Sequence, residues 1–246
     1  MIDLHCHALP GIDDGPADIQ GSIALARAAR DGGTSTLVTT PHIDHWWDVD
    51  PASLPGRVAE VGAVLEREGI DIELRTGGEI SLTRVIDLDE HELDGLALGG
   101  GRHVLLEAPL TSGTGDFEAL ILAVLERRPV LLAHPERCPG FLREPERYER
   151  LLDDGVFGQL TAGSFIGQFG GTIRKTVLDW LDRGWVHVVA SDSHDAYKRP
   201  PDLRGPLARA GVPDELAAWL TAAVPTAIVE RGPIPERPAE AVKPRA

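Results

Sequence analysis

The chain has 246 residues, of which 42% are hydrophobic and 26% charged, a composition typical of a globular protein that excludes an intrinsically disordered one. Its 39 acidic and 24 basic side chains give a formal net charge of −15, so most of the surface repels nucleic acid and no nucleic-acid partner is expected. Two cysteines, no apolar run of membrane-spanning length and no leader-like start predict a cytoplasmic protein without membrane insertion.

Short β-rich runs alternate along the chain with longer segments of helical periodicity. The first run, MIDLHC, is followed by an amphipathic segment that ends at a pair of glycines, as helices commonly do. We expect seven strands, near residues 1–6, 34–40, 70–78, 102–108, 128–134, 155–161 and 185–191, and helices near 17–33, 52–68, 115–127, 145–154 and 172–183.

Strands that are separated by helices are joined by crossover connections and therefore run parallel. The strand-like runs are almost continuously apolar, which fits strands that are buried on both faces. The pattern predicts an α/β fold, with a closed or nearly closed parallel barrel favoured over an open sheet. Residues 1–232 are expected to form one domain, and the proline-rich, charged residues 233–246 a flexible tail.

Potential metal ligands follow six of the seven predicted strands. Because the carboxyl ends of the strands in such a barrel face one common mouth, we expect these side chains to converge. The candidates are His5, His7, Asp14, His42, Glu79, Glu107, His134, Asp192 and His194.

Alternation along the first strand places His5 and His7 on one side and Cys6 on the other. Imidazole nitrogens and carboxylate oxygens suit zinc, manganese or iron, and five histidines with four carboxylates exceed what one ion can use. Two or three ions are therefore expected. A single histidine at a strand end is most often structural, so the prediction depends on all nine placements together.

The sequence resembles the polymerase-and-histidinol-phosphatase (PHP) superfamily, and within it the bacterial manganese-dependent tyrosine-protein phosphatases that accompany capsular and exopolysaccharide synthesis. The matching stretches span residues 1 to about 201 in the family's order. They are MIDLHCHALPGIDDGP, TTPH, GGEI, LLEAP, PVLLAHPER, AGSFIGQFG and VHVVASDSHDAYKRPP.

This resemblance implies a distorted seven-stranded (β/α)7 TIM-like barrel that carries three divalent ions, manganese in the first place and zinc or iron as alternatives. It implies that His5, His7, Glu79 and Asp192 hold one ion. Glu79 would bridge to a second ion, held also by Glu107 and His134, and Asp14, His42 and His194 would hold the third.

The implied reaction is phosphoester hydrolysis by a metal-activated hydroxide. Three divalent ions and four ligand carboxylates leave the mouth with a charge of about +2, which attracts a phosphate dianion to an otherwise acidic protein. Arg137 and Arg199 match arginines that the family places near its substrate, although surface ion pairs would also account for them. The tyrosyl oxygen is a good leaving group, with a pKa of about 10, and His194 or a water could protonate it. The implied partner is a phosphotyrosine protein, such as the tail of a polysaccharide-synthesis kinase.

Four other functions compete with the implied one. A cysteine-based phosphatase needs an arginine six positions after its cysteine, but those positions hold Ile12 and Glu144. The bridging lysine of many amidohydrolases has no counterpart, because Glu107 stands at the middle strand. A histidinol-phosphate or other small-molecule phosphatase of the same superfamily stays open, as does a non-catalytic metal-binding scaffold.

The chain departs from the phosphatase pattern after His42, where the family usually has a basic, polar loop and this sequence has IDHWWDVDPASLPG. Trp46 and Trp47 could form an aromatic wall for a phosphotyrosine ring or could pin the loop to the barrel. His45 is not expected to be a ligand. Thr161 stands where the family often has asparagine. Both departures lie near the expected mouth and concern substrate identity.

Overall fold

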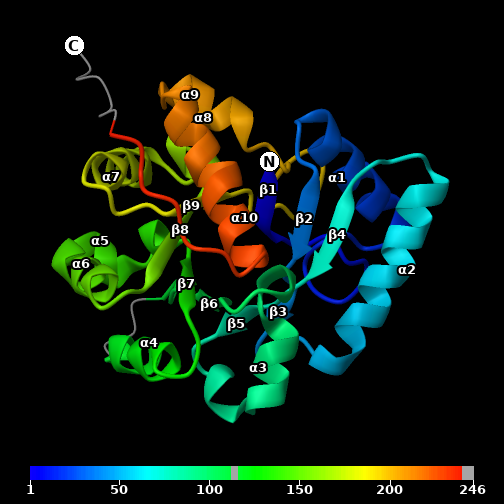
Figure 1. Ribbon diagram of the computed structural model, residues 1–246, viewed down its shortest axis with the longest axis horizontal. Coiled ribbons are helices and arrows are strands. Elements are labelled where there is room, and N and C mark those ends of the chain that lie inside the picture. Colours follow the sequence, from blue (N-terminus) through cyan, green and yellow to red (C-terminus); the bar gives the residue numbers. More distant parts are fainter. Residues whose placement is uncertain (112–115, 240–246) are drawn as a thin grey trace.

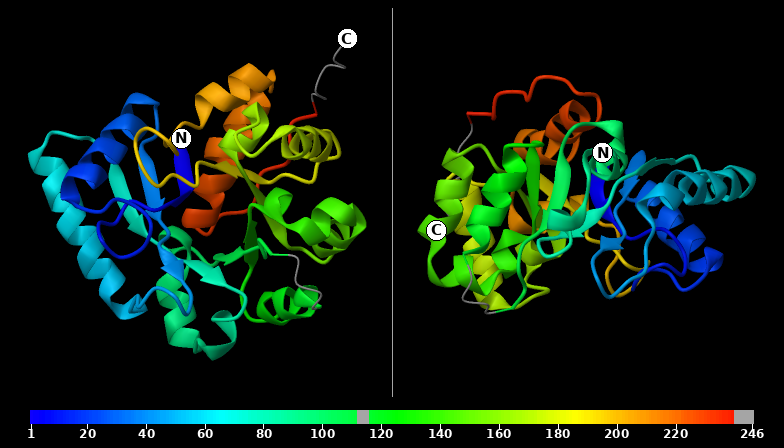
Figure 2. Two further views of the ribbon diagram at one scale, coloured as in Figure 1. Left: turned by 180° about the vertical axis from the view of Figure 1, so that it is seen from behind. Right: turned by 90° about the horizontal axis from the view of Figure 1, so that it is seen from below.

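The structure, a computed structural model, describes residues 1–111 and 116–239 (Figure 1). Within these residues the chain forms nine strands, which lie at the centre of the molecule with helices around them (Figures 1 and 2). They are β1 (Ile2–Cys6), β2 (Thr36–Thr39), β3 (His42–Ile43), β4 (Glu73–Thr76), β5 (Glu79–Ser81), β6 (Val104–Glu107), β7 (Val130–Ala133), β8 (Phe157–Thr161) and β9 (Val188–Ala190).

All strand pairs are parallel, in the orders β1-β2-β4 and β3-β5-β6-β7-β8-β9. Two strands continue past their expected ends at residues 40 and 78 after a short break: β3 follows β2 after two residues, and β5 follows β4 after two residues. The breaks fall at residues 40–41, which include a proline without an N–H group, and at the glycine pair of residues 77–78. A side chain on Gly78 would lie 2.7 Å from Leu96 and 2.9 Å from Ile43, so close packing requires glycine there.

The outer strands β1 and β9 meet and close the ring. Cys6 pairs with Ser193, the His7 N–H donates to the Ser193 carbonyl at 2.8 Å, and the Asp192 N–H donates to the His5 carbonyl at 2.9 Å. Counting each interrupted strand once, the closed ring has seven strands. The predicted distorted (β/α)7 barrel is therefore confirmed.

The helices predicted from periodicity are present, the first of them as α1 (Ile19–Asp31). The others are α2 (Leu54–Arg67), α4 (Phe117–Leu125), α6 (Pro145–Asp153) and α7 (Gly171–Asp182). Residue 115, the expected start of α4, lies outside the described residues. Five shorter helices were not predicted, since five to seven residues show too little of the 3.6-residue period. They are α3 (Glu90–Leu96), α5 (Pro139–Arg143), α8 (Arg204–Ala210), α9 (Asp214–Ala218) and α10 (Val224–Val229).

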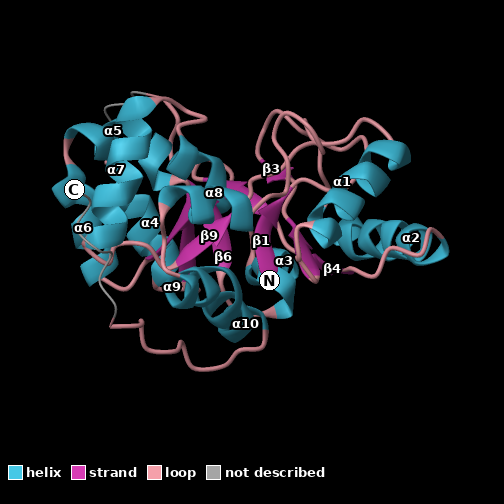
Figure 3. Cartoon of the chain, turned by 90° about the horizontal axis from the view of Figure 1, so that it is seen from above, coloured by secondary structure: helices cyan, strands magenta, loops and turns pink. Residues whose placement is uncertain are grey.

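One end of the barrel is covered by α9, α10 and the π-helical turn Trp219–Ala223 between them, which contacts β1 and β9. Figure 3 shows α9 and α10 below the strands and the loop after β3 above them. The loops that follow the carboxyl ends of the strands therefore lie at the opposite end from these helices.

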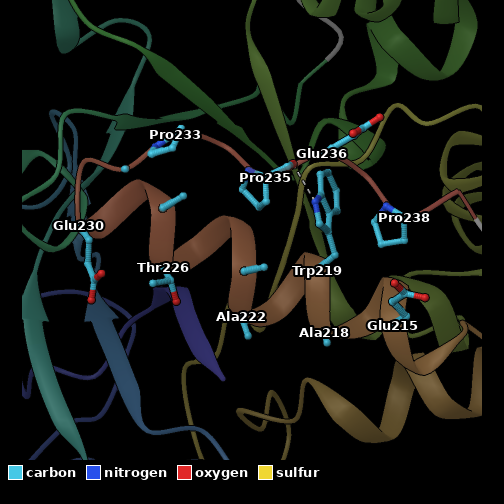
Figure 4. Close-up of a pocket in the computed structure, with 13 residues that line it drawn as sticks. Glu215, Ala218, Trp219, Ala222, Thr226, Glu230, Pro233, Pro235, Glu236 and Pro238 are labelled. Carbon is cyan, nitrogen blue, oxygen red and sulfur yellow. Dashed lines mark hydrogen bonds between the residues drawn. The ribbon is translucent and has the colours of Figure 1, made fainter.

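Residues 232–239 run along these helices (Figure 4). The Trp219 indole N–H donates to the Pro235 carbonyl at 3.0 Å, and its ring stands between Pro235 and Pro238. Arg237 donates to the carbonyls of Val186 and Leu181 at 3.2 and 2.8 Å. These contacts fall within the segment expected to be a flexible tail; residues 240–246 of that segment lie outside the described residues.

Tyr148 on α6 is buried against β8, and its hydroxyl donates to the Trp185 carbonyl at 2.8 Å. The ring of Tyr148 lies 4.6 Å from that of Trp180, centroid to centroid. Gly158 faces this hydroxyl so closely that a Cβ atom there would lie 1.7 Å from the oxygen. The packing of α6 on the barrel thus depends on the absence of a side chain at Gly158.

Gly158→Ala is therefore expected to lower the free energy of unfolding by about 1–3 kcal/mol, because the added methyl overpacks the core. Urea titration followed by circular dichroism measures the change. Gly62→Ala in α2, where an added Cβ meets no atom within 4 Å, is the control and should stabilise by up to about 1 kcal/mol. The double variant Gly158→Ala/Tyr148→Phe should lose less unfolding free energy than the sum of the losses in the two single variants. A loss equal to that sum would contradict the explanation.

Candidate metal centre

The nine candidate ligands lie together at the carboxyl ends of the strands. Their donor atoms form four groups, within each of which all donor atoms lie within 4.8 Å of one another. The groups are His7, Asp14, His42 and His194; His5, Glu79 and His134; His5, His7 and Asp192; and His42, Glu79 and Glu107.

His5 and His7 face each other through their Nε2 atoms, which are 3.3 Å apart. The Asp192 Oδ1 atom lies 3.4 Å from the first and 3.7 Å from the second. Two ligands at about 2.0–2.1 Å from a tetrahedral ion are separated by about 3.3–3.4 Å. The spacing of these donor atoms therefore fits a common metal ion. Cys6 is buried and belongs to none of the four groups.

Glu79 is the hub of the centre. Its Oε2 atom is buried and lies 3.1, 3.3 and 3.4 Å from nitrogens of His42, His5 and His7, yet it accepts no well-formed hydrogen bond within the described residues. Its Oε1 atom is 2.8 Å from Nε2 of His134. Burial opposes ionisation of Glu79, but the charge of His5 and the hydrogen bond from His134 outweigh it, so the pKa of Glu79 is lowered.

Asp14 lies at the outer side of the centre, where its Oδ1 atom is 3.1 Å from Nε2 of His194 and 3.3 Å from Nε2 of His42. The Nδ1 atom of His194 lies 3.1 Å from the Asp192 carbonyl, which can only accept, so the proton sits on Nδ1 and Nε2 is free to bind a metal. Burial lowers the pKa of His194, which keeps this imidazole neutral at pH 7.

Three histidines of the centre, His5, His7 and His42, have raised pKa values. Burial disfavours the charged form of His7, but the hydrogen bond to Asp13 and the nearby charge of Glu79 outweigh it and raise its pKa to about 9. Burial is likewise outweighed at His42, where Asp14 and Glu79 raise the pKa to about 11. Burial and the nearby charge of Glu79 raise the pKa of Glu107 to about 7. Without metal ions, protons supply the positive charge that the buried carboxylates require.

Two candidate ligands have a positive φ angle, a backbone conformation that glycine adopts more easily than other residues. His134 has φ +35° and Asp192 has φ +52°, both in the left-handed region. A non-glycine residue there costs free energy and is common at functional sites. The strain places each side chain immediately after its strand, at the mouth.

Three residues that the sequence did not single out support the ligands. Asp13 Oδ2 is 2.8 Å from Nδ1 of His7 and accepts the His42 backbone N–H at 3.1 Å, while its Oδ1 accepts from Gly15. Gln159 Oε1 lies 2.8 Å from Nδ1 of His5. Such partners fix the ring orientation of a metal-binding histidine.

Glu136, the third of these residues, is fully buried. Its Oε1 atom accepts from the Thr161 N–H at 2.9 Å and from the Ser164 hydroxyl at 2.7 Å. Burial raises the pKa of Glu136 to about 7. These bonds tie the turn after β7, which carries Arg137, to the turn after β8. The HPER and AGS stretches contain the partners, but no local pattern pairs them.

Arg137 and Arg199 reach the centre from two sides. Their guanidinium groups both donate to Asp192 Oδ2, at 2.7 and 2.6 Å. Trp46, in contrast, is 92% exposed, so its ring neither touches the ligands nor pins its loop to the barrel. His45 lies outside the ligand groups, 3.4 Å from the Thr83 carbonyl.

Comparison with known proteins gives concordant matches. A family model described as capsular polysaccharide synthesis, CpsB/CapC, matches residues 1–210. The tyrosine-protein phosphatase YwqE of Bacillus subtilis is 31% identical over 201 residues, which cover 81% of this chain and 79% of YwqE. The tyrosine-protein phosphatase CpsB of Streptococcus pneumoniae is 28% identical over 217 residues, covering 83% of this chain and 87% of CpsB.

The fold comparison agrees with these matches. A crystal structure from work on YwqE and CpsB, described as metal-dependent tyrosine phosphatases, superposes with a TM-score of 0.84 and 28% identity over 99% of this chain and 100% of that one. The organophosphorus hydrolase of Deinococcus radiodurans superposes with a TM-score of 0.55 and 17% identity over 93% of this chain and 91% of that one, which shows a shared fold only.

Asp13→Ala should weaken binding of Mn²⁺ to the metal-free protein by about 10–100-fold, because His7 and the His42 backbone lose the acceptor that orients them. Isothermal titration calorimetry measures the affinity. Asp31→Ala is the matched control, since that exposed carboxylate on α1 pairs only with Arg30 among the contacts described. Equal affinities of Asp13→Ala and the wild type would contradict the orienting role.

Proposed function

This chain belongs to the CpsB/CapC family of capsular polysaccharide synthesis, and on that premise we propose that it is a metal-dependent protein-tyrosine phosphatase. Its substrate is phosphotyrosine on a protein, and we propose the tail of a polysaccharide-synthesis kinase. The observation that carries the proposal is the convergence of nine histidine and carboxylate ligands with two arginines at one barrel mouth. The phosphatase names of the relatives YwqE and CpsB support it further.

We propose that the centre holds three divalent ions, with manganese as the native metal. His5, His7, Glu79 and Asp192 would hold the first, Glu79, Glu107 and His134 the second, and Asp14, His42 and His194 the third. The buried Oε2 atom of Glu79 supports this assignment, since a bridging carboxylate oxygen between imidazoles is left without a proper partner until metal is bound.

When bound, divalent ions supply Lewis acidity toward the phosphoryl oxygens and a water nucleophile that is available near neutral pH. Arg137 and Arg199 bind the remaining phosphoryl oxygens. Arg137 and Arg199 each hold one N–H group on Asp192 Oδ2, and a planar guanidinium keeps further donors free for a phosphate. Because Asp192 orients both guanidinium groups, they are positioned before the substrate arrives.

The tyrosyl oxygen leaves readily because the pKa of tyrosine is about 10. Either His194 or a water would supply a proton to this oxygen. The lowered pKa of His194 and the free lone pair of its Nε2 atom favour the ligand role for this side chain, so we propose the water as the proton donor. We also propose that Trp46 contacts the substrate, because its ring is exposed on the loop that follows His42.

The proposed compartment is the cytoplasm. Among the described residues none of the helices combines the length and the apolar character that crossing a lipid bilayer requires. A histidinol-phosphate phosphatase is the second candidate, since the same ligands support its chemistry. The names of the relatives favour phosphotyrosine.

The purified protein with Mn²⁺ should release phosphate from a phosphotyrosine peptide faster than from histidinol phosphate or a nucleotide, and chelation should abolish the reaction. His5→Ala and Glu79→Ala should each lower kcat by about 100-fold or more, because the Lewis-acid centre loses a ligand. His91→Ala, an exposed histidine on α3, is the control. A faster rate on histidinol phosphate would favour the second candidate instead.

Metal affinity should rise with pH. In the metal-free protein His7, with a pKa of about 9, and His42, with a pKa of about 11, are protonated at pH 7, and a metal ion must displace those protons. Between pH 6 and 8 the affinity for Mn²⁺ should therefore increase about tenfold or more per pH unit. Calorimetry in buffers of different ionisation enthalpy measures the protons released; no release would contradict the raised pKa values.

A further inference from the structure

Large apolar side chains that are exposed concentrate at the mouth. In the part of the chain that the structure describes, six such residues occur: Trp46, Trp47, Ile86, Leu110, Leu120 and Tyr197. All except Leu120, which lies on α4, are in the connecting segments that follow the carboxyl ends of strands, Ile86 within the short 3-10 helix Val85–Asp87. We call Trp46, Trp47, Ile86, Leu110 and Tyr197 the apolar rim. Trp46 and Tyr197 are 92% and 85% exposed, which is unusual for large aromatic side chains of a monomer.

Each part of the rim follows a candidate ligand closely in the sequence. Trp46 comes four residues after His42, and Tyr197 three residues after His194. Leu110 and Ile86 likewise follow Glu107 and Glu79 by three and seven residues. The strands that precede these residues belong to one continuous arc of the barrel, from β9 through β1, β2/β3 and β4/β5 to β6. The rim therefore borders the metal centre along that arc.

The backbone of the rim is held in place, although its side chains are exposed. Asp44 Oδ1 accepts the N–H groups of Trp46 and Trp47 at 2.7 and 2.9 Å. In the same way, Asp195 Oδ1 accepts the Tyr197 N–H at 2.6 Å. His45 bridges the loop of Trp46 to that of Ile86 through the Thr83 carbonyl, 3.4 Å away. Loops whose backbone is fixed in this way lose little backbone conformational freedom on binding.

We propose that the apolar rim binds the polypeptide on either side of the phosphotyrosine, so that the enzyme selects segments with apolar flanking side chains; this rests on the proposed function. The position of the rim supports it, because a chain whose phosphotyrosine reaches the ligands must cross the surrounding loops. Charge argues against an anionic membrane as the occupant: the loop of Trp46 also carries Asp44, Asp48 and Asp50, which such a surface repels.

The experiment compares three substrates with Mn²⁺: free phosphotyrosine, a phosphotyrosine nonapeptide with leucine and valine flanks, and the same peptide with glycine and serine flanks. For the wild type, kcat/KM on the apolar peptide should exceed that on the glycine–serine peptide by about tenfold. Trp46→Ala and Tyr197→Ala should each reduce this ratio by about three- to tenfold, mainly through KM, and the double variant should bring it close to one.

Leu120→Ser is the matched control, since it removes the exposed large apolar residue away from the mouth and should keep the ratio. Circular dichroism and metal content confirm folding of each variant, and Trp46→Phe, which retains an aromatic ring, should keep part of the preference.

The two proposals fail in different ways. A wild type that hydrolyses free phosphotyrosine but treats both peptides alike would overturn the rim proposal and leave the proposed function standing. A wild type that hydrolyses no phosphotyrosine substrate would overturn the proposed function itself. The rim could instead bind a second copy of the chain, which light scattering tests through the molar mass. A wild-type dimer that dissociates in Trp46→Ala would assign the rim to self-association and overturn the rim proposal.

Discussion

The centre of this protein depends on one buried carboxylate. Glu79 is almost completely shielded from water, and a buried negative charge is stable only beside compensating positive charge or hydrogen-bond donors. The barrel brings four imidazoles to it, from β1, β3 and β7. Protons on His7 and His42 serve that purpose in the metal-free protein, and the donor atoms already lie at the spacing that ligands of one metal ion have.

The convergence of the candidate ligands could be predicted from the sequence because the fold turns a linear pattern into a spatial one. Parallel strands end at one edge, so residues at strand ends as far apart as His5 and His194 meet without any contact information. The apolar runs themselves indicated the strands. The two breaks, at residues 40–41 and 77–78, were not foreseen, because a short interruption in an apolar run resembles an ordinary strand end.

The supporting shell was missed for a physical reason. Asp13 and Gln159 act by hydrogen bonds to the far side of an imidazole, and nothing in residue type or spacing marks which polar side chain will reach that atom. Asp13 stands beside the ligand Asp14 in the sequence, so only the geometry distinguishes the two roles. The short helices α9 and α10 were missed as well, because they are defined by packing on the end of the barrel and show little periodicity of their own.

The way the ring closes has a consequence for how the protein is made. The first strand, which carries His5 and His7, finds its second neighbour only in β9, more than 180 residues later. During synthesis, at about 5–20 residues per second, the amino-terminal strand therefore leaves the ribosome long before its last hydrogen-bonding partner exists. Until then the chain has an unpaired strand edge and lacks Asp192 and His194, so the mouth cannot be complete before β9 has been synthesised.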